Sequence, residues 1–204
     1  AAFDGHRSDD FRPYLYVSDD FGANWAPIVT GLPNSSLNAL AQHPDEPDLL
    51  FVGNELGLYV SVDAGRNWVA MRGNLPTVPV DDIEIHPREN DLVLGTHGRG
   101  IWIMEDLTPL TELSDAVAAG GAYLFPVRRA TSFNPYTPQG WTPGIFAAPN
   151  PPFGAYIRYY LPAPADDATL EIKSATGVLM RTLEAPGRSE EHTSELQSRP
   201  HISY

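Results

Sequence analysis

The amino-acid sequence predicts an all-β protein: a partial β-propeller, its last two to three blades, followed by the start of an immunoglobulin-like β-sandwich. Short apolar runs of strand length alternate with turns rich in glycine and proline, of which the 204 residues include 17 and 20. The pattern Ser-x-Asp-x-Gly-x-x-Trp occurs twice, forty-three residues apart. A repeat in the low forties is typical of propellers, in which each repeat forms one four-stranded blade.

The repeat extends well beyond this octapeptide. SDDFGANW, residues 18–25, recurs as SVDAGRNW, residues 61–68. Three further segments recur at the same distance: Leu32-Pro33 as Leu75-Pro76, His43-Pro44 as His86-Pro87, and Gly57-Leu58-Tyr59 as Gly100-Ile101-Trp102. One residue is lost and regained between these segments, since Gly53 matches Gly95. The copies predict successive blades, of which the first and the third are incomplete.

The strands of each repeat follow from its apolar runs, which are rich in β-branched and aromatic residues. Those expected in the second repeat are 37–42, 49–53, 57–62 and 67–72. Those expected in the third are 82–86, 92–95 and 100–105. The first repeat is expected to begin just before a strand at 14–18. Residues 1–106 are therefore predicted to be the C-terminal blades of a propeller whose N-terminal part lies outside this sequence and is required to complete the ring.

The repeated octapeptide has a structural explanation. An Asp or Ser side chain accepts backbone N–H bonds across a tight turn, Gly takes a positive φ, and Trp covers the turn with its ring. We interpret Asp20 and Asp63 as turn residues rather than catalytic carboxylates. The residues predicted to build the two turns are Ser18, Asp20, Gly22 and Trp25, and Ser61, Asp63, Gly65 and Trp68.

On these motifs the sequence resembles the bacterial neuraminidase repeat (BNR, Asp-box) family. It is most similar to large bacterial propeller proteins described as glycosyl hydrolase-like or sortilin-like. The resemblance is carried by LFVGNELGLYVSVDAGRNW, residues 50–68, and LPTVPVDDIEIHPRENDLVLGTHGRGIWIMEDLTPL, residues 75–110, and covers about residues 10–185. It implies the propeller fold and a secreted or periplasmic location. It implies no single activity, since Asp-boxes occur in sialidases, other glycosidases, sortilin-type receptors and non-catalytic propellers.

The chain after the propeller is predicted in three parts. Residues 107–152 form a connector rich in Pro and Gly, whose Phe133, Tyr136 and Trp141 either serve as sugar platforms or pin the connector to a blade. Residues 153–187 form a truncated β-sandwich, because AYIRYYL, ATLEIKS and VLMRTLE alternate apolar and polar residues. Residues 188–204 contain RSEEHTSELQS, which resembles a translated sequencing adapter. We treat them as non-native and assign His192 and His201 to no site.

Composition excludes several classes of protein. The net charge of −13 would repel a phosphate backbone, so no nucleic-acid partner is expected. No apolar run reaches the length of a membrane span. The chain has no cysteine, which excludes disulfides and thiolate metal sites. His43 and His86 lie in separate repeats without a chelating neighbour, so neither a metal nor a cofactor is expected.

Propeller geometry selects the candidate site. The hairpins between the second and third strands of each blade lie at the mouth of the channel, with the loops that enter the innermost strands. The ligand-face candidates are Asn54, Glu55, Asp81, Asp82, His97 and Arg99. Glu55 and His97 occupy equivalent positions of adjacent blades and are expected to approach a common ligand. Alternatively, His97 caps its turn. The glycines of GTHGRG fit a tight turn better than a phosphate loop, because no helix follows them.

Two functions fit these residues. The first is a peptide- or glycan-binding scaffold module. The alternative is a glycoside hydrolase whose catalytic residues lie mostly in blades outside this sequence. Glycosidases need two carboxylates at a set distance across the bond that is cleaved. The available carboxylates are Glu55, Asp81, Asp82 and Glu84, and the sequence does not single out two of them as such a pair. The segment FRPY, residues 11–14, lacks the isoleucine of the Phe/Tyr-Arg-Ile-Pro motif of sialidases.

Overall fold

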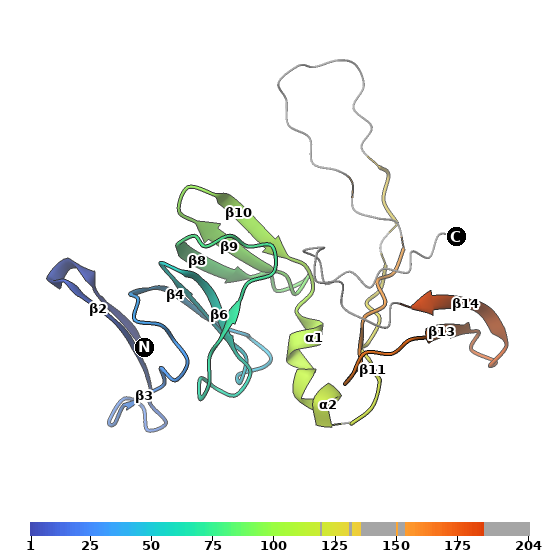
Figure 1. The fold of residues 1–204 in the computed structure, drawn as a ribbon, viewed down its shortest axis with the longest axis horizontal. Helices are drawn as coiled ribbons and strands as arrows, with labels where there is room; N and C mark the ends of the chain where they lie inside the picture. The colour runs from blue at the N-terminus through green and yellow to red at the C-terminus, as the bar shows by residue number, and fades with distance from the viewer. Residues whose placement is uncertain (119, 131, 136–149, 151–153, 186–204) are drawn as a thin grey trace, which may run out of the picture. The chain divides into compact units, whose positions relative to one another are not determined.

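The computed structural model in Figure 1 describes residues 1–118, 120–130, 132–135, 150 and 154–185. Ala1–Ala118 form one compact unit, and the described residues from 120 onward belong to a second. The all-β prediction is confirmed, since every sheet is antiparallel and the described residues contain only two short α-helices and one 3-10 turn. The two units are described separately below.

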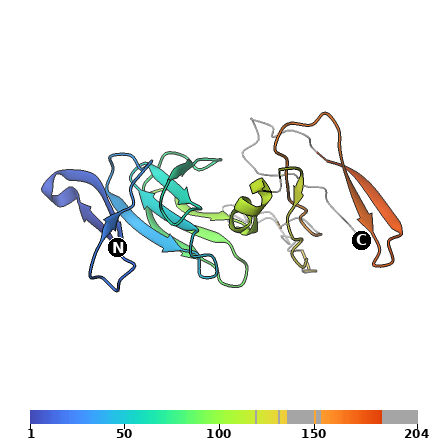
Figure 2. The ribbon, with the colours of Figure 1, turned by 90° about the horizontal axis from the view of Figure 1, so that it is seen from below.

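The first unit contains three antiparallel sheets, which follow one another in chain order in both views (Figures 1 and 2). The first sheet consists of β1 (Ala2–Gly5), β2 (Asp10–Val17) and β3 (Ala26–Pro27), with η1 (His6–Ser8) after β1. The second consists of β4 (Leu37–Gln42), β5 (Leu50–Asn54), β6 (Gly57–Ser61) and β7 (Val69–Met71). The third consists of β8 (Val80–Ile85), β9 (Leu92–Thr96) and β10 (Gly100–Met104). Each sheet is a meander of consecutive strands, which is the arrangement of a propeller blade.

The predicted strands of the second and third repeats are all present, with two differences in the chain around them. The outer strand β7 begins at Val69 rather than at residue 67, because Asn67 and Trp68 belong to the preceding turn. The first repeat contains β1, which was not expected, paired with β2 through Ala2↔Leu15 and Phe3↔Tyr14. The sequence of β1, AFDG, has no apolar run of the kind that marks the other strands, and its side chains are mostly exposed.

The core lies between successive sheets. Phe51 and Leu58 of the second sheet pack with Val80, Leu92 and Leu94 of the third. Leu15 of the first sheet packs with four residues that follow it in the chain, Leu37, Val52, Tyr59 and Trp68. The chain after β10 joins this core, because Leu107 is fully buried there just before α1 (Thr108–Thr111) and α2 (Leu113–Ala118). The first residues of the predicted connector therefore pack on the third sheet.

The innermost strands β4 and β8 each contain a β-bulge at the same position of the repeat. The register shifts between Leu37 and Ala39 in β4, and between Val80 and Asp82 in β8. Side chains two apart in a regular strand face the same side, whereas Leu37 and Ala39 pack into different clusters on the two sides of the sheet. The bulge residues Asn38 and Asp81 are exposed. Bulges often re-aim a side chain beside a functional site.

The two repeated octapeptides form tight turns that are held by the same hydrogen bonds. In the first, Asp20 accepts hydrogen bonds from Ser18 Oγ at 2.9 Å and from the backbone N–H of Asn24 at 2.8 Å, and Ser18 Oγ accepts the N–H of Gly22 at 2.7 Å. In the second, Ser61 and Asp63 make the same bonds to Gly65 and Asn67 within 0.1 Å. Gly22 and Gly65 have φ values of +90° and +82°. These bonds join residues no more than four apart, so each turn is built by its own sequence.

The asparagine of each turn completes the motif and was not among the predicted turn residues. The side-chain amides of Asn24 and Asn67 donate to Asp20 Oδ2 and Asp63 Oδ2 at 2.5 and 2.7 Å. The pKa of Asp20 is lowered, first by the backbone N–H of Asn24 and then by its amide. Burial raises the pKa of Asp63, but the hydrogen bonds from Asn67 and Ser61 outweigh it and leave the pKa lowered. Both aspartates are thus held as carboxylates that tie the turn together.

Replacing Asp63 by alanine is expected to lower the free energy of unfolding at pH 7 by about 1–2 kcal/mol, because three hydrogen bonds to a partly exposed carboxylate are lost. A lowered folded-state pKa stabilises the fold above the ordinary value of 3.8, and this contribution is lost as the pH falls through the folded-state pKa. Urea unfolding at pH 7 and below pH 3 should therefore show a smaller difference between the variant and the wild type at acidic pH. An equal difference at both pH values would contradict this explanation.

The tryptophans of the two turns have different surroundings. Trp68 is 4% exposed, and its indole N–H donates to the Ile28 carbonyl at 2.8 Å, while its backbone N–H donates to Thr30 at 2.9 Å. Trp25 is 51% exposed, and its indole N–H bonds to Gly22 within its own turn at 3.1 Å. The segment that follows one sheet thus covers the Asp-box tryptophan of the next.

The second unit contains two small antiparallel pairs. β11 (Tyr123–Leu124) pairs with β12 (Tyr159–Tyr160), and β13 (Ala168–Lys173) pairs with β14 (Leu179–Ala185). All three strands expected after residue 153 are present, but the first pairs with β11 from the predicted connector rather than with the strand that follows it. Phe133 is half-buried. Tyr136, Trp141 and the tail at 188–204 lie outside the described residues. No α-helix in the described part of the chain has the length and apolar character of a membrane span.

A polar row across two neighbouring sheets

Four polar side chains form a hydrogen-bonded row where β4 and β8 begin. The Asn38 amide nitrogen donates to Glu55 Oε1 at 3.1 Å and to Asp81 Oδ1 at 3.2 Å. His97 Nδ1 lies 3.2 Å from Asp81 Oδ2. We call Glu55, Asn38, Asp81 and His97 the polar row. It joins the β5–β6 and β9–β10 hairpins through the bulge residues of the two innermost strands.

The row follows the symmetry of the repeat. Asn38 and Asp81 are equivalent bulge residues, and Glu55 and His97 are equivalent hairpin residues. The contact within the second sheet, Asn38 with Glu55, therefore recurs in the third as Asp81 with His97, and the Asn38–Asp81 bond links the two. Glu55 and His97 lie at opposite ends of the row instead of facing each other directly. Asn38 was not predicted, although its position forty-three residues before Asp81 was a signal for it.

The hydrogen-bond chemistry of the row determines what it offers to a ligand. A carboxylate only accepts, so the Nδ1 of His97 carries the proton that it shares with Asp81. The Asn38 amide nitrogen is likewise directed at the two carboxylates. With His97 neutral, the groups left over are therefore acceptors: the second Glu55 oxygen, lone pairs of Asp81 and His97 Nε2. The row is open to solvent, since the Asp81 and His97 side chains are 48% and 80% exposed.

The structure also brings the carboxylates of Glu55 and Asp81 close together, which the sequence did not predict. Because Glu55 Oε1 lies 3.1 Å and Asp81 Oδ1 3.2 Å from the Asn38 nitrogen, the two oxygens are at most about 6.3 Å apart. The carboxyl groups of glycosidases lie about 5–10 Å apart. The Asn38 amide occupies the space between Glu55 and Asp81. In a glycosidase, the glycosidic bond of the substrate lies between the two carboxylates.

Three other ligand-face candidates lie outside the row. Asn54 is fully buried, and its Oδ1 accepts the backbone N–H of Leu56 at 2.8 Å, so it shapes the β5–β6 hairpin. Asp82 is exposed, and one of its oxygens accepts the N–H of Ile83 at 3.0 Å. Arg99 is exposed in the β9–β10 hairpin, and its carbonyl accepts the indole N–H of Trp102 at 3.1 Å. Asp82 and Arg99 remain accessible, whereas Asn54 does not reach the surface.

The β9–β10 hairpin is a tight turn built by glycines. Gly98 and Gly100 have φ values of +80° and +71°, a region that glycine adopts at low cost. The Thr96 hydroxyl donates to the Gly100 carbonyl at 2.7 Å and closes the turn. The imidazole of His97 bonds to Asp81 and not to the turn backbone, so its side chain is directed to the polar row.

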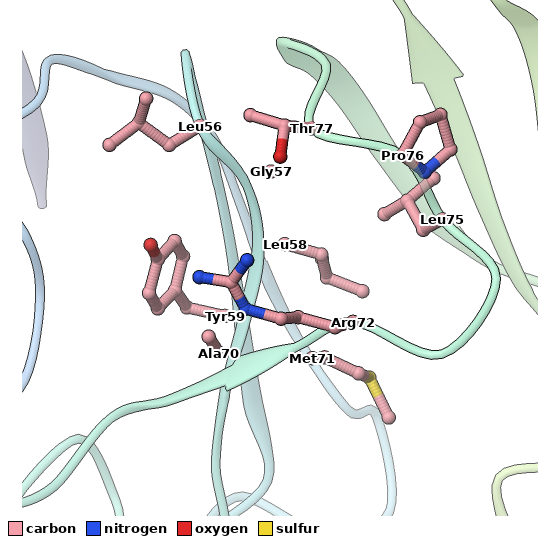
Figure 3. Close-up of a pocket in the computed structure, with 10 residues that line it drawn as sticks. All are labelled: Leu56, Gly57, Leu58, Tyr59, Ala70, Met71, Arg72, Leu75, Pro76 and Thr77. Atoms are coloured by element: carbon pink, nitrogen blue, oxygen red, sulfur yellow. The ribbon is translucent and has the colours of Figure 1, made fainter. Parts of the chain in front are cut away.

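A small cavity of about 40 Å³ lies beside the β5–β6 hairpin, lined by Leu56 and Gly57, by residues of β6 and β7, and by Leu75, Pro76 and Thr77 (Figure 3). The Arg72 side chain reaches toward the Tyr59 ring across it. One water molecule needs about 10–15 Å³ of such space, so the cavity has room for a few water molecules. It makes no ligand pocket by itself.

Arg12 and the metal-ligating side chains of the described residues also bear on catalysis. Arg12, in the segment that resembles the sialidase motif in part, pairs with Asp10 at 2.5 Å on its own strand. That Arg12 guanidinium, with the Tyr14 hydroxyl, lowers the pKa of Asp10. Among the described residues, no three His, Asp or Glu side chains are arranged to hold a metal ion.

The chain matches no protein-family model and no curated protein sequence. The resemblance to the Asp-box family is thus based on the motifs in the sequence, and membership of that family stays a prediction.

Proposed function

We propose that the chain is part of a secreted or periplasmic Asp-box propeller and acts as a peptide- or glycan-binding scaffold module. The observation that carries the proposal is the polar row, in which equivalent residues of two repeats form one exposed, hydrogen-bonded surface. Two bulges in the same position of the repeat place the central residues of this row. Glu55, Asn38, Asp81 and His97 are all exposed, so a ligand can reach every member of the row.

The chemistry of the row selects its ligands. Because its free groups are acceptors and two of its members are carboxylates, it favours ligands that present N–H or O–H donors. Glycan hydroxyls and the ammonium or guanidinium groups of a peptide are such donors. A ligand rich in phosphate or sulfate would be repelled, which agrees with the net charge of −13.

Glycoside hydrolysis is the second candidate, favoured by the proximity of Glu55 and Asp81. Both carboxylates bond to the same Asn38 amide, and glycosidase chemistry uses such a neighbouring pair. Binding is the better-supported function because Asn38 lies between the two carboxylates and both are bonded to it. A substrate would have to displace this amide before its glycosidic bond could lie between the acid and the second carboxylate.

Asp81→Asn is expected to weaken ligand binding by at least tenfold, since it removes a charge and replaces an acceptor that faces both Asn38 and His97. The measurement is binding of the full chain to an immobilised glycan panel and to a peptide library, followed by titration of the ligands that are retained. Glu171→Gln is the matched control, because Glu171 is an exposed, ion-paired carboxylate of the second unit.

The same proteins should be assayed with chromogenic glycosides. Turnover that is lost in both Asp81→Asn and Glu55→Gln would establish the hydrolase instead. Ligand binding that is equal in the wild type, Asp81→Asn and Asn38→Ala would refute a role for the polar row.

A further inference from the structure

We propose that a second cavity, at the opposite ends of β4 and β8 from the polar row, binds a single neutral sugar residue. The cavity has a volume of about 260 Å³. It lies between the β4–β5 turn, which begins at His43, and the β8–β9 turn, which begins at His86, with Thr111 of α1 also lining it. The two turns are copies of one His-Pro segment, and the site arises from a difference between them.

The histidine of the first copy has a partner for each ring nitrogen. His43 Nδ1 accepts the backbone N–H groups of Asp45 and Glu46 at 3.2 and 3.1 Å, which places its proton on Nε2. That Nε2–H donates to Asn90 Oδ1 of the next turn at 2.7 Å. His43 is 5% exposed. It is therefore a structural residue that holds two turns together.

The histidine of the second copy has a partner for one nitrogen only. His86 Nδ1 accepts the backbone N–H of Glu89 at 3.1 Å, so the neutral ring again carries its proton on Nε2. No described residue accepts a hydrogen bond from this Nε2, and His86 is half-buried at the wall of the cavity. The turn therefore presents an N–H donor, held in one tautomer, to whatever occupies the cavity.

The other groups of the wall restrict the ligand. Asp45 and Glu46 accept hydrogen bonds from ligand hydroxyls and repel anions, whereas the His86 donor requires an acceptor on the ligand. Pro44 and Pro87 add apolar surface from each turn. A neutral polyol ring has hydroxyls that both donate and accept, together with apolar C–H faces. The volume lies just below the range of about 300–1,000 Å³ of drug-sized pockets, which fits one ring rather than a chain.

The wall excludes two other occupants. For a metal ion, no three His, Asp or Glu side chains among the described residues are suitably arranged, and both nitrogens of His43 are already bonded. A phosphate or carboxylate would lie against the carboxylates of Asp45 and Glu46, and the described side chains leave only neutral donors free here, His86 Nε2–H and the Asn90 amide. The site is independent of the polar row. It shares no residue with the row, and it lies where β4 and β8 end, whereas the row lies where they begin.

The test is a titration of the full chain with glucose, galactose and mannose, and with their methyl glycosides, by saturation-transfer NMR and calorimetry. At least one sugar should bind saturably to the wild type. His86→Asn should weaken that binding by at least tenfold, because an asparagine oxygen still accepts the Glu89 N–H while the Nε2 donor is gone. His86→Gln should retain most of it, because its amide reaches further and donates.

Arg88→Gln is the control, as Arg88 belongs to the same turn, has a side chain 81% exposed and does not line the cavity. Binding of methyl glycosides would identify the end of a glycan chain as the source of the ligand, and binding of free sugars alone would identify a free monosaccharide. Either result agrees with the site. Absence of binding by every sugar, or equal binding by His86→Asn with an unchanged melting temperature, would overturn it. Asp81→Asn tests the polar row alone, so the two proposals can fail separately.

Discussion

Replacing Trp68 by alanine is expected to lower the free energy of unfolding by about 3–5 kcal/mol, the usual range for a buried aromatic side chain. The indole is 4% exposed and packs with Leu15, Leu37 and Tyr59 between the first two sheets. Its loss leaves a cavity there and also leaves the Ile28 carbonyl without its donor. The three sheets depend on such contacts, so the variant should unfold at a clearly lower urea concentration.

Trp25→Ala is the matched control for this prediction. Trp25 has the same position in the same turn motif, but it is 51% exposed and bonds only within its own turn. We expect Trp25→Ala to lower the free energy of unfolding by less than about 1 kcal/mol. Far-UV circular dichroism should follow the urea transition, because both substitutions remove a fluorophore. Equal costs would mean that the turn itself, and not packing between sheets, determines the contribution of the tryptophan.

Replacing Gly53 by alanine is expected to destabilise the protein by about 2–3 kcal/mol, because added atoms in a packed core force the backbone apart. A Cβ at residue 53 would lie 2.5 Å from the Val80 carbonyl oxygen and 2.8 Å from its Cγ1. Gly53 is in β5 and Val80 in β8, so the glycine allows two sheets to approach each other. Since Asp81 follows Val80, the same substitution should displace the polar row and weaken its ligand binding.

Gly95→Ala is the control, since Gly95 is the repeat equivalent of Gly53. A Cβ there would meet the Asp82 Cβ at 3.2 Å, which a small movement relieves. Urea unfolding should show that Gly95→Ala lowers the free energy of unfolding by less than about 1 kcal/mol. Ligand binding at the polar row should be reduced more by Gly53→Ala than by Gly95→Ala. The reverse order would show that the close approach of β5 to β8 does not position Asp81.

The strands and Asp-box turns could be predicted from the sequence because their determinants are local. Apolar runs of strand length mark β4 to β6 and β8 to β10, and the bonds of Asp20 and Asp63 reach no further than four residues. β1 escaped prediction because it is formed by pairing with β2, and its own exposed side chains have no apolar pattern. The candidate positions Glu55, Asp81 and His97 also followed from the repeat.

The sequence by itself thus determined an all-β chain of repeated strands and turns, whereas the tertiary structure decided how each copy of a repeated residue is used. Trp25 is exposed and Trp68 is buried, and both ring nitrogens of His43 are hydrogen-bonded whereas only one of His86 is. Asn38 joins the polar row because a bulge turns it out and Asp81 lies beside it, forty-three residues away. The physical reason is that burial and hydrogen-bond partners come from the neighbouring sheet, and identical local motifs do not specify what that neighbour presents.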